Sequence, residues 1–192
     1  MSCPVYLAMA AGDTQCSIPP TTERRTGTPI ILKHKNIPFR LTIVGDGTEL
    51  SRLRFLTKEL NIENNVNFVG RINNFEIPEL LQNSNFYISM PITEGVSASL
   101  FEAMACGCFP IVTDLPGNRS WIQEKVNGIL VPSENHTKLA EELEWAFNNS
   151  NATKKAIRNN RKFVEENANY KMNMKKIACT YNDLITIKST TT

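Results

Sequence analysis

Residues 86–113, FYISMPITEGVSASLFEAMACGCFPIVT, place a strand, a helix and a second strand in direct succession. The runs at 86–90 and 109–113 are short, apolar and rich in β-branched and aromatic residues, which indicates buried strands. Residues 97–105 between them predict a helix, and Gly107 stands where a left-handed residue commonly ends one. Two strands joined by a helix predict a parallel pair, because parallel strands need a crossover connection.

The same alternation continues on both sides of this stretch. Further strands are predicted at 39–45, 66–70 and 128–131, and further helices at 48–62, 76–84, 119–125, 136–149, 152–167 and 171–187. The strands are continuous apolar runs, which is typical of a parallel sheet covered on both faces. The predicted fold class is therefore α/β, a Rossmann-like, doubly wound parallel sheet with C-terminal helices.

The chain of 192 residues is long enough for one well-buried domain. We assign residues 39–192 to this domain and leave residues 1–38 as a separate N-terminal segment. Residues 16–29, CSIPPTTERRTGTP, are rich in Pro and Thr and show no period. Residues 4–12, PVYLAMAAG, are compatible with a first strand, and they lack the preceding basic residues of a secretion signal.

Composition narrows the classes of function. A formal net charge of +2 without a basic block gives no reason to expect nucleic acid as a partner. No apolar run reaches the roughly 18–20 residues of a membrane-spanning helix. Five cysteines and two histidines fit no metal spacing, so we expect no metal site and reduced thiols in the cytoplasm.

Ligands of open parallel sheets bind outside the carboxyl ends of the strands, which directs attention to the loops there. Gly45-Asp46-Gly47 follows the strand at 39–45, and its glycines permit positive φ and a close backbone approach to a phosphate. The third glycine of a dinucleotide fingerprint is missing, because Leu50 takes its place. A tight turn with an exposed Asp46 is an equally good interpretation.

The loop after the strand at 86–90 carries the stronger signal. Glu94 lies on this loop, ahead of the helix, where a polar ligand is the better explanation for a carboxylate. The free backbone N–H groups from Gly95 to Ala98 predict an anion pocket that suits a diphosphate. Glu102 has a competing structural explanation, because Ser99 and Glu102 have the spacing of a capping box.

Four segments together carry a resemblance to a known family: LTIVGDG, VNFVGRI, FYISMPITEGVSASLFEAMACGCFPIVTD and NGILVP. In this order they resemble the C-terminal, donor-binding half of retaining GT-B glycosyltransferases of family 4, also called group 1. The two acids Glu94 and Glu102 match the E-x7-E signature of that family. The resemblance covers about residues 39–149, and it makes the predicted domain one half of a GT-B fold.

The resemblance implies a role for each matching position. Glu94, the candidate catalytic residue, would face the donor sugar and accept hydrogen bonds from its hydroxyls. Glu102 would bind the ribose. The sugar and phosphates would meet the backbone of Gly95, Val96, Ser97 and Ala98. Leu100 would pack near the nucleoside, and the base would be held by Arg71 and Ile72. Gly45 and Gly47 would line the same site.

The implied reaction transfers a sugar from a nucleotide-diphospho-sugar to an acceptor hydroxyl with retention of configuration. It needs no cofactor and no metal, because cationic side chains and a helix terminus stabilise the leaving diphosphate. The family usually supplies an Arg and a Lys from a segment upstream of IVGDG. This chain has no such segment, and Arg24, Arg25, Lys33 and Lys35 are the nearby cations.

The resemblance also implies partners and a location. The acceptor, whether a glycan, a lipid or a small molecule, would be held by an N-terminal domain, which would belong to a longer form of this chain or to a separate chain. The complete enzyme would be cytoplasmic or peripheral to a membrane. A non-catalytic nucleotide-sugar-binding module is the main alternative. Two further alternatives are a glycoside hydrolase and an NAD-binding domain. A glycoside hydrolase would use two carboxylates and would need no phosphate pocket.

Overall fold

The structure, a computed structural model, describes residues 5–10, 32–33, 35–93 and 95–190. Six strands within these residues form one sheet in which every pairing is parallel. The strands, in chain order, are β1 Val5–Ala10, β2 Phe39–Val44, β3 Val66–Gly70, β4 Phe86–Ser89, β5 Phe109–Thr113 and β6 Ile129–Val131. The Rossmann-like α/β fold is thereby confirmed.

The order of strands across the sheet is β3-β2-β1-β4-β5-β6. This is the Rossmann order, in which the direction of winding reverses between the first and the fourth strand. β1 lies at the centre, paired with β2 on one side and with β4 on the other. Residues 5–10, which the sequence left in the N-terminal segment as compatible with a first strand, thus form a middle strand of this sheet.

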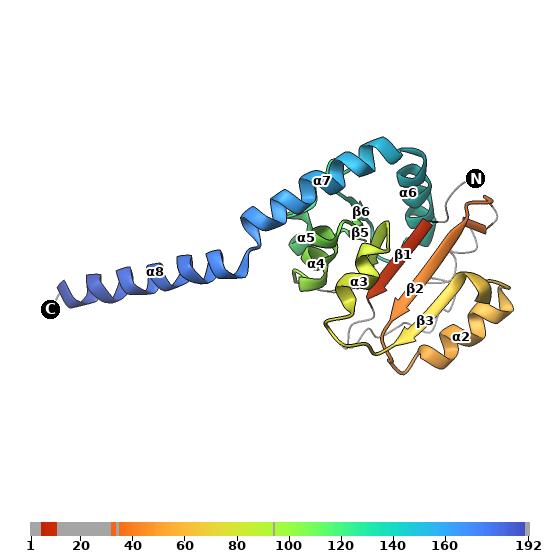
Figure 1. The fold of residues 1–192 in the computed structure, drawn as a ribbon, viewed down its shortest axis with the longest axis horizontal. Helices are drawn as coiled ribbons and strands as arrows, with labels where there is room; N and C mark the ends of the chain where they lie inside the picture. Colours follow the sequence, from red (N-terminus) through yellow and green to blue (C-terminus); the bar gives the residue numbers. More distant parts are fainter. Residues whose placement is uncertain (1–4, 11–31, 34, 94, 191–192) are drawn as a thin grey trace.

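The helices fill the connections between strands and then form the C-terminal part of the chain (Figure 1). They are α2 Leu50–Glu59, α3 Ile77–Gln82, α4 Ala98–Cys106, α5 Pro116–Arg119, α6 His136–Asn148, α7 Ser150–Asn167 and α8 Tyr170–Thr190, with a 3-10 turn at Glu63–Asn65. Pro78 stands in the first turn of α3. Gly107 adopts φ 95° at the end of α4, which confirms the predicted helix end.

The helix predicted at 119–125 is wrong. α5 already ends at Arg119, and a turn follows it. The Asn127 side chain organises this turn, because its Oδ1 accepts from the backbone N–H of Gln123 (2.7 Å) and its Nδ2 donates to the carbonyl of Trp121 (2.9 Å). These bonds satisfy backbone groups that a helix would otherwise pair, and Lys125 takes a positive φ of 59°.

Alternate side chains along the strands enter two separate cores. One core joins Phe86, Ile88, Phe109 and Ile111 to Leu139 and Leu143 of α6 on one face of the sheet. The other joins Tyr87 and Val112 to α3, α4 and α7 on the opposite face, through Leu81, Leu100, Ala103, Met104 and Val164. The period of two along each strand therefore produces the doubly wound arrangement.

α8 leads away from this body as a single helix (Figure 1). Its described side chains include several large exposed apolar ones, at Tyr170, Met172, Met174, Ile177, Tyr181 and Ile185. In the part of the chain that the structure describes, no helix combines the length and the apolar character needed to cross a membrane.

Candidate functional site

The reversal of strand order between β1 and β4 marks the crevice where ligands bind in sheets of this kind. The loop from Pro91 to Ser97, which follows β4, opens at the carboxyl edge beside this reversal. Glu94 lies outside the described residues, so its predicted role stays a prediction. Its neighbours Gly95 and Val96 are exposed, and Ser97 is half-buried.

α4 begins directly after this loop. Ser97 is its N-cap residue, with the extended backbone (φ −79°, ψ 129°) usual at that position. Among the described residues the Ser97 hydroxyl does not cap the helix. It lies 2.7 Å from the Ser99 hydroxyl, which lies 2.7 Å from the hydroxyl of buried Tyr87 on β4. The first-turn N–H groups are thereby left uncapped by the N-cap side chain at the edge where a ligand would bind.

The capping-box explanation of Glu102 is wrong. Because the helix starts at Ala98, Ser99 is inside it rather than at its N-cap, and Glu102 falls in the second turn. Its side chain is exposed on α4, whereas Leu100, Ala103 and Met104 point into the core. Glu102 is thus a solvent-facing carboxylate one turn beyond the first turn of α4, where the sequence predicted an anion pocket.

Leu100 is a core residue in this structure, 1% exposed beneath α4, and its packing near a nucleoside stays a prediction. Arg71 is exposed on the loop after β3, and Ile72 lines a hollow of about 310 Å³ with Glu76, Glu79, Leu80 and Asn83 along α3. The Ile72 side chain therefore lies against α3.

A backbone hydrogen bond connects the loops after β2 and β3. The N–H of Gly45 donates to the carbonyl of Gly70 (2.8 Å), and both glycines have positive φ, 131° and 72°. Gly47 does not use the positive φ that glycine permits, and a Cβ added to it would have no described atom within 4 Å. Asp46 is exposed, as the tight-turn interpretation predicted.

The loop after β5, residues 114–118, is one of the strand-end loops to which the sequence directed attention, but no residue of it was assigned to the site. An ideal Cβ on Gly117 would lie 2.6 Å from the carbonyl oxygen of Gly95 and 3.3 Å from the backbone nitrogen of Val96. Only glycine permits this approach, so the loop after β5 presses against the loop after β4. Buried Asn118 fixes the turn by donating to the carbonyl of Thr113 (2.8 Å). The Pro-Gly-Asn run at a strand end was the available signal.

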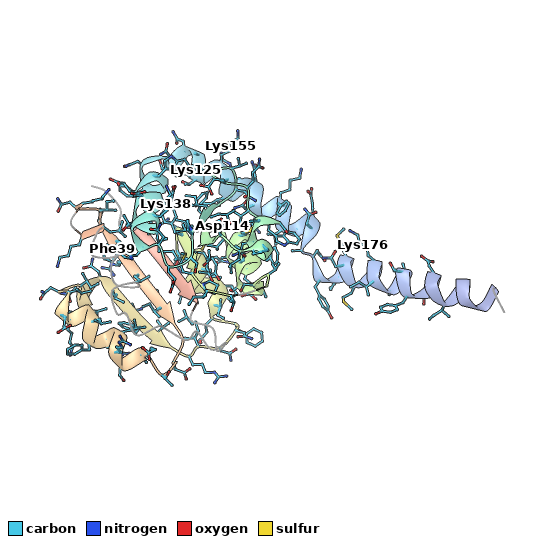
Figure 2. All side chains as sticks on the ribbon, turned by 180° about the vertical axis from the view of Figure 1, so that it is seen from behind. Phe39, Asp114, Lys125, Lys138, Lys155 and Lys176 are labelled. Atoms are coloured by element: carbon cyan, nitrogen blue, oxygen red, sulfur yellow. The ribbon has the colours of Figure 1, made fainter. Side chains whose placement is uncertain are left out.

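Asp114 begins the same loop and Arg119 ends α5 (Asp114 is labelled in Figure 2). Arg119 donates from Nε and from a terminal nitrogen to the two carboxylate oxygens of Asp114, at 2.6 and 3.1 Å. These hydrogen bonds lower the pKa of Asp114 below its ordinary value. The pair places a guanidinium group at the carboxyl edge, on the loop that contacts Gly95.

Two of the four cations named from the sequence, Lys33 and Lys35, lie away from this site. Lys33 donates from Nζ to the carbonyls of Leu60 and Asn61 (3.3 and 2.8 Å), beyond the end of α2. Lys35 pairs with Glu144 of α6. Both lysines precede β2, at the amino edge of the sheet, which excludes them from the carboxyl-edge site in this conformation. Arg24 and Arg25 lie outside the described residues.

Charged and thiol side chains, the kinds that bind metal ions, lie on α4 at Glu102 and Cys106. No three His, Cys, Asp or Glu side chains among residues 5–10, 32–33, 35–93 and 95–190 are grouped so as to hold an ion. The thiol of Cys106, one turn beyond Glu102, has a raised pKa because of burial and the nearby Glu102 charge, which the Arg161 charge only partly offsets. A thiol of this kind stays protonated and is a poor nucleophile at neutral pH.

Known proteins resemble this chain in sequence and fold. An uncharacterized glycosyltransferase of Haemophilus influenzae is 35% identical over 121 residues, which cover 62% of this chain and 33% of that protein. The crystal structure of HepE of Anabaena in complex with UDP-glucose has a TM-score of 0.78 at 18% identity, covering 94% of this chain and 49% of the other. At that identity the likeness concerns the fold alone.

A third similarity concerns a single domain. The crystal structure of the C-terminal domain of a glycosyl transferase group 1 family protein from Francisella tularensis has a TM-score of 0.73 at 19% identity, with 86% and 87% of the two chains covered. The present chain spans about one third of the first relative and about half of HepE. The family model for glycosyl transferases group 1 matches residues 29–163. The chain therefore belongs to the glycosyl transferases group 1 family.

Proposed function

We propose that this chain is the donor-binding half of a retaining glycosyltransferase, which transfers a sugar from a nucleotide-diphospho-sugar to an acceptor hydroxyl. The observation that carries the proposal is the position of the loop Gly95–Ser97 and the start of α4, at the reversal of strand order. The N–H groups of this first turn, which the Ser97 side chain leaves uncapped, suit a diphosphate, and family membership makes a nucleotide-sugar the corresponding ligand.

In this proposal each acid has a separate task. Glu94 faces the donor sugar, and Glu102, exposed one turn further along α4, accepts hydrogen bonds from the ribose hydroxyls. The exposed Arg71 and the backbone beside Ile72 hold the base. Gly45 and Gly47 border the site, and Arg119 is a cation positioned to approach the diphosphate if its pairing with Asp114 opens.

The proposed reaction also needs a site for the acceptor. An acceptor-binding domain, in the same or a separate chain, would complete the site, and the acceptor is a glycan, a lipid or a small molecule. The reaction requires no metal, because N–H groups and cations offset the charge of the leaving diphosphate. Cytoplasmic location is part of the proposal, and Cys106, Cys108 and Cys179 are free thiols in accord with it.

Titration calorimetry with UDP, GDP and UDP-glucose tests the donor site directly. For Glu102→Ala we expect at least a tenfold loss of affinity for every nucleotide, because the ribose hydroxyls lose a charged acceptor. For Glu94→Ala we expect the free nucleotides to bind normally and only the added affinity from the sugar to disappear.

Glu59→Ala is the matched control, since Glu59 is exposed at the far end of α2 and is expected to leave all affinities unchanged. Unaltered nucleotide affinity in Glu102→Ala would refute the ribose assignment. Equal losses for free and sugar-linked nucleotide in Glu94→Ala would refute the division of tasks between the two acids.

A further inference from the structure

A chain of hydroxyl groups runs from the core to the start of α4. Tyr87 lies on β4 and is 2% exposed, with its ring packed in the core beneath α4. Its hydroxyl is 2.7 Å from the hydroxyl of Ser99, which is 2.7 Å from that of the N-cap residue Ser97. Either member of each pair can donate, so the three groups form a continuous hydrogen-bonded row.

The row connects two elements that must keep a fixed relation for a ligand to bind. β4 is a central strand, paired on both sides, and therefore the more rigid partner. Ser97 and Ser99 flank Ala98 at the exposed first turn of α4. A tyrosine hydroxyl buried with a partner is a directional contact, unlike the apolar packing around it.

We infer that Tyr87 and Ser99 are positioning residues for donor binding, which fix Ser97 and the first turn of α4 against the sheet. The inference rests on the proposed function, because it concerns the same N–H groups that would meet the diphosphate. Tyr87 is 2% exposed, so we assign it an indirect role, through its hydrogen bond with Ser99 and the bond from Ser99 to Ser97. The anchored turn needs less ordering when a nucleotide binds.

The alternative is that the row serves stability alone. Removing one buried hydroxyl costs stability wherever it lies, so the loss of stability by itself decides nothing. Thr153→Val provides the matched control. Thr153 is 6% exposed in α7, its hydroxyl donates to the carbonyl of Ser150 (3.0 Å), and valine keeps its shape.

The experiment measures UDP, GDP and ADP binding to the full chain by calorimetry. We expect Tyr87→Phe and Ser99→Ala each to lower affinity three- to tenfold, and the double variant to lose no more than either single one. Ser99→Thr, which retains the hydroxyl, is expected to bind nucleotides more tightly than Ser99→Ala and close to the wild-type affinity. Amide hydrogen exchange at 98–101 is expected to be faster in Tyr87→Phe and unchanged in Thr153→Val.

The outcomes separate the inference from the function on which it rests. A wild-type chain that binds while Tyr87→Phe binds within twofold of it overturns the inference alone. Equal weakening by Thr153→Val reduces the row to a structural role and also overturns it. A wild-type chain that binds none of the three nucleotides overturns the proposed function, and the inference with it.

Discussion

At the scale of single residues, Glu142 is a buried carboxylate that forms ion pairs with two lysines. Its side chain is 4% exposed on α6, and Lys138 and Lys125 approach its two oxygens at 2.7 and 3.2 Å (both lysines are labelled in Figure 2). Lys125 also lies 4.8 Å from the centre of the Trp145 ring. Burial alone would raise the pKa of Glu142, but hydrogen bonds from Lys138 and Lys125 outweigh burial and lower it.

We therefore expect Glu142→Gln to lower the free energy of unfolding at pH 7 by about 1–3 kcal/mol, below the loss at a fully buried pair because both lysines reach solvent. Because the pKa of Glu142 is lower in the folded protein, its carboxylate stabilises the fold at pH values above the unfolded-state pKa of about 4.3. This stabilisation is lost as the pH falls through the folded-state pKa. The difference between wild type and variant should thus shrink below about pH 4.

Urea unfolding at pH 7, 5 and 3.5 measures this dependence. Glu141→Gln on the same helix is the control, because Glu141 is 53% exposed and its ion pair with Lys138 is long, at 3.6 Å. A Glu142→Gln deficit that stayed constant with pH would contradict the assignment of the effect to carboxylate charge.

At the scale of elements, the start of α4 depends on what surrounds it. The loop after β5 reaches Gly95 through Gly117, and the hydroxyl row reaches Ser97 from beneath. The aromatic rings of Phe101, Trp121 and Phe163 then join α4 to α7 edge to face, with centres 4.8 and 5.9 Å apart. α4 is thus held along its length, and its first turn remains open.

Gly117→Ala tests the contact between the two loops. The added methyl would meet backbone atoms 2.6 and 2.8 Å away, which cannot rotate aside, so the loop after β4 must move. We expect at least a tenfold loss of nucleotide affinity and about 1–3 kcal/mol of destabilisation, as for overpacking elsewhere. Calorimetry and thermal unfolding measure the two effects.

Ser120→Ala belongs to the same segment and is exposed, so it controls for disturbance of α5. Wild-type affinity in Gly117→Ala would mean that the loop after β4 tolerates displacement, and the close approach would then have no part in binding.

At the scale of the whole molecule, the C-terminal helices differ from the body in charge and packing. Residues 150–190 contain nine Lys or Arg and three Asp or Glu, within a chain whose net charge is +2. Lys155 on α7 and Lys176 on α8 illustrate this cationic arm (Figure 2). α7 is anchored by Ala156 and Val164, one in each core, whereas α8 leads away from the body.

We expect a chain ending at Asn169 to keep the melting temperature of the full chain to within about 2 °C, because α8 adds little packing to the body. Circular dichroism followed through thermal unfolding measures this. A chain ending at Asn149 is the comparison and should fail to fold cooperatively, since it loses Ala156 and Val164. A fall of more than 5 °C on removing α8 alone would show that α8 stabilises the body.

Much of the fold and part of the site followed from local pattern. Apolar runs marked β2 to β6, and Gly107 marked the end of α4, because strand burial and the left-handed helix end are each encoded within a few residues. The loop after β4 was identified for the same reason, as a small-residue segment between a strand and a helix. The capping box at Ser99 had the right spacing but the wrong helix start.

Strand order and contacts between loops were decided only by the tertiary structure. The central place of β1, the approach of Gly117 to Gly95 and the reach of Tyr87 to Ser99 join residues that are distant in sequence. Such contacts depend on which elements pack together, and no local period or propensity encodes that choice. The sequence by itself determined the family and most of the elements from β2 onward, whereas packing determined the place of β1 and how the site is assembled.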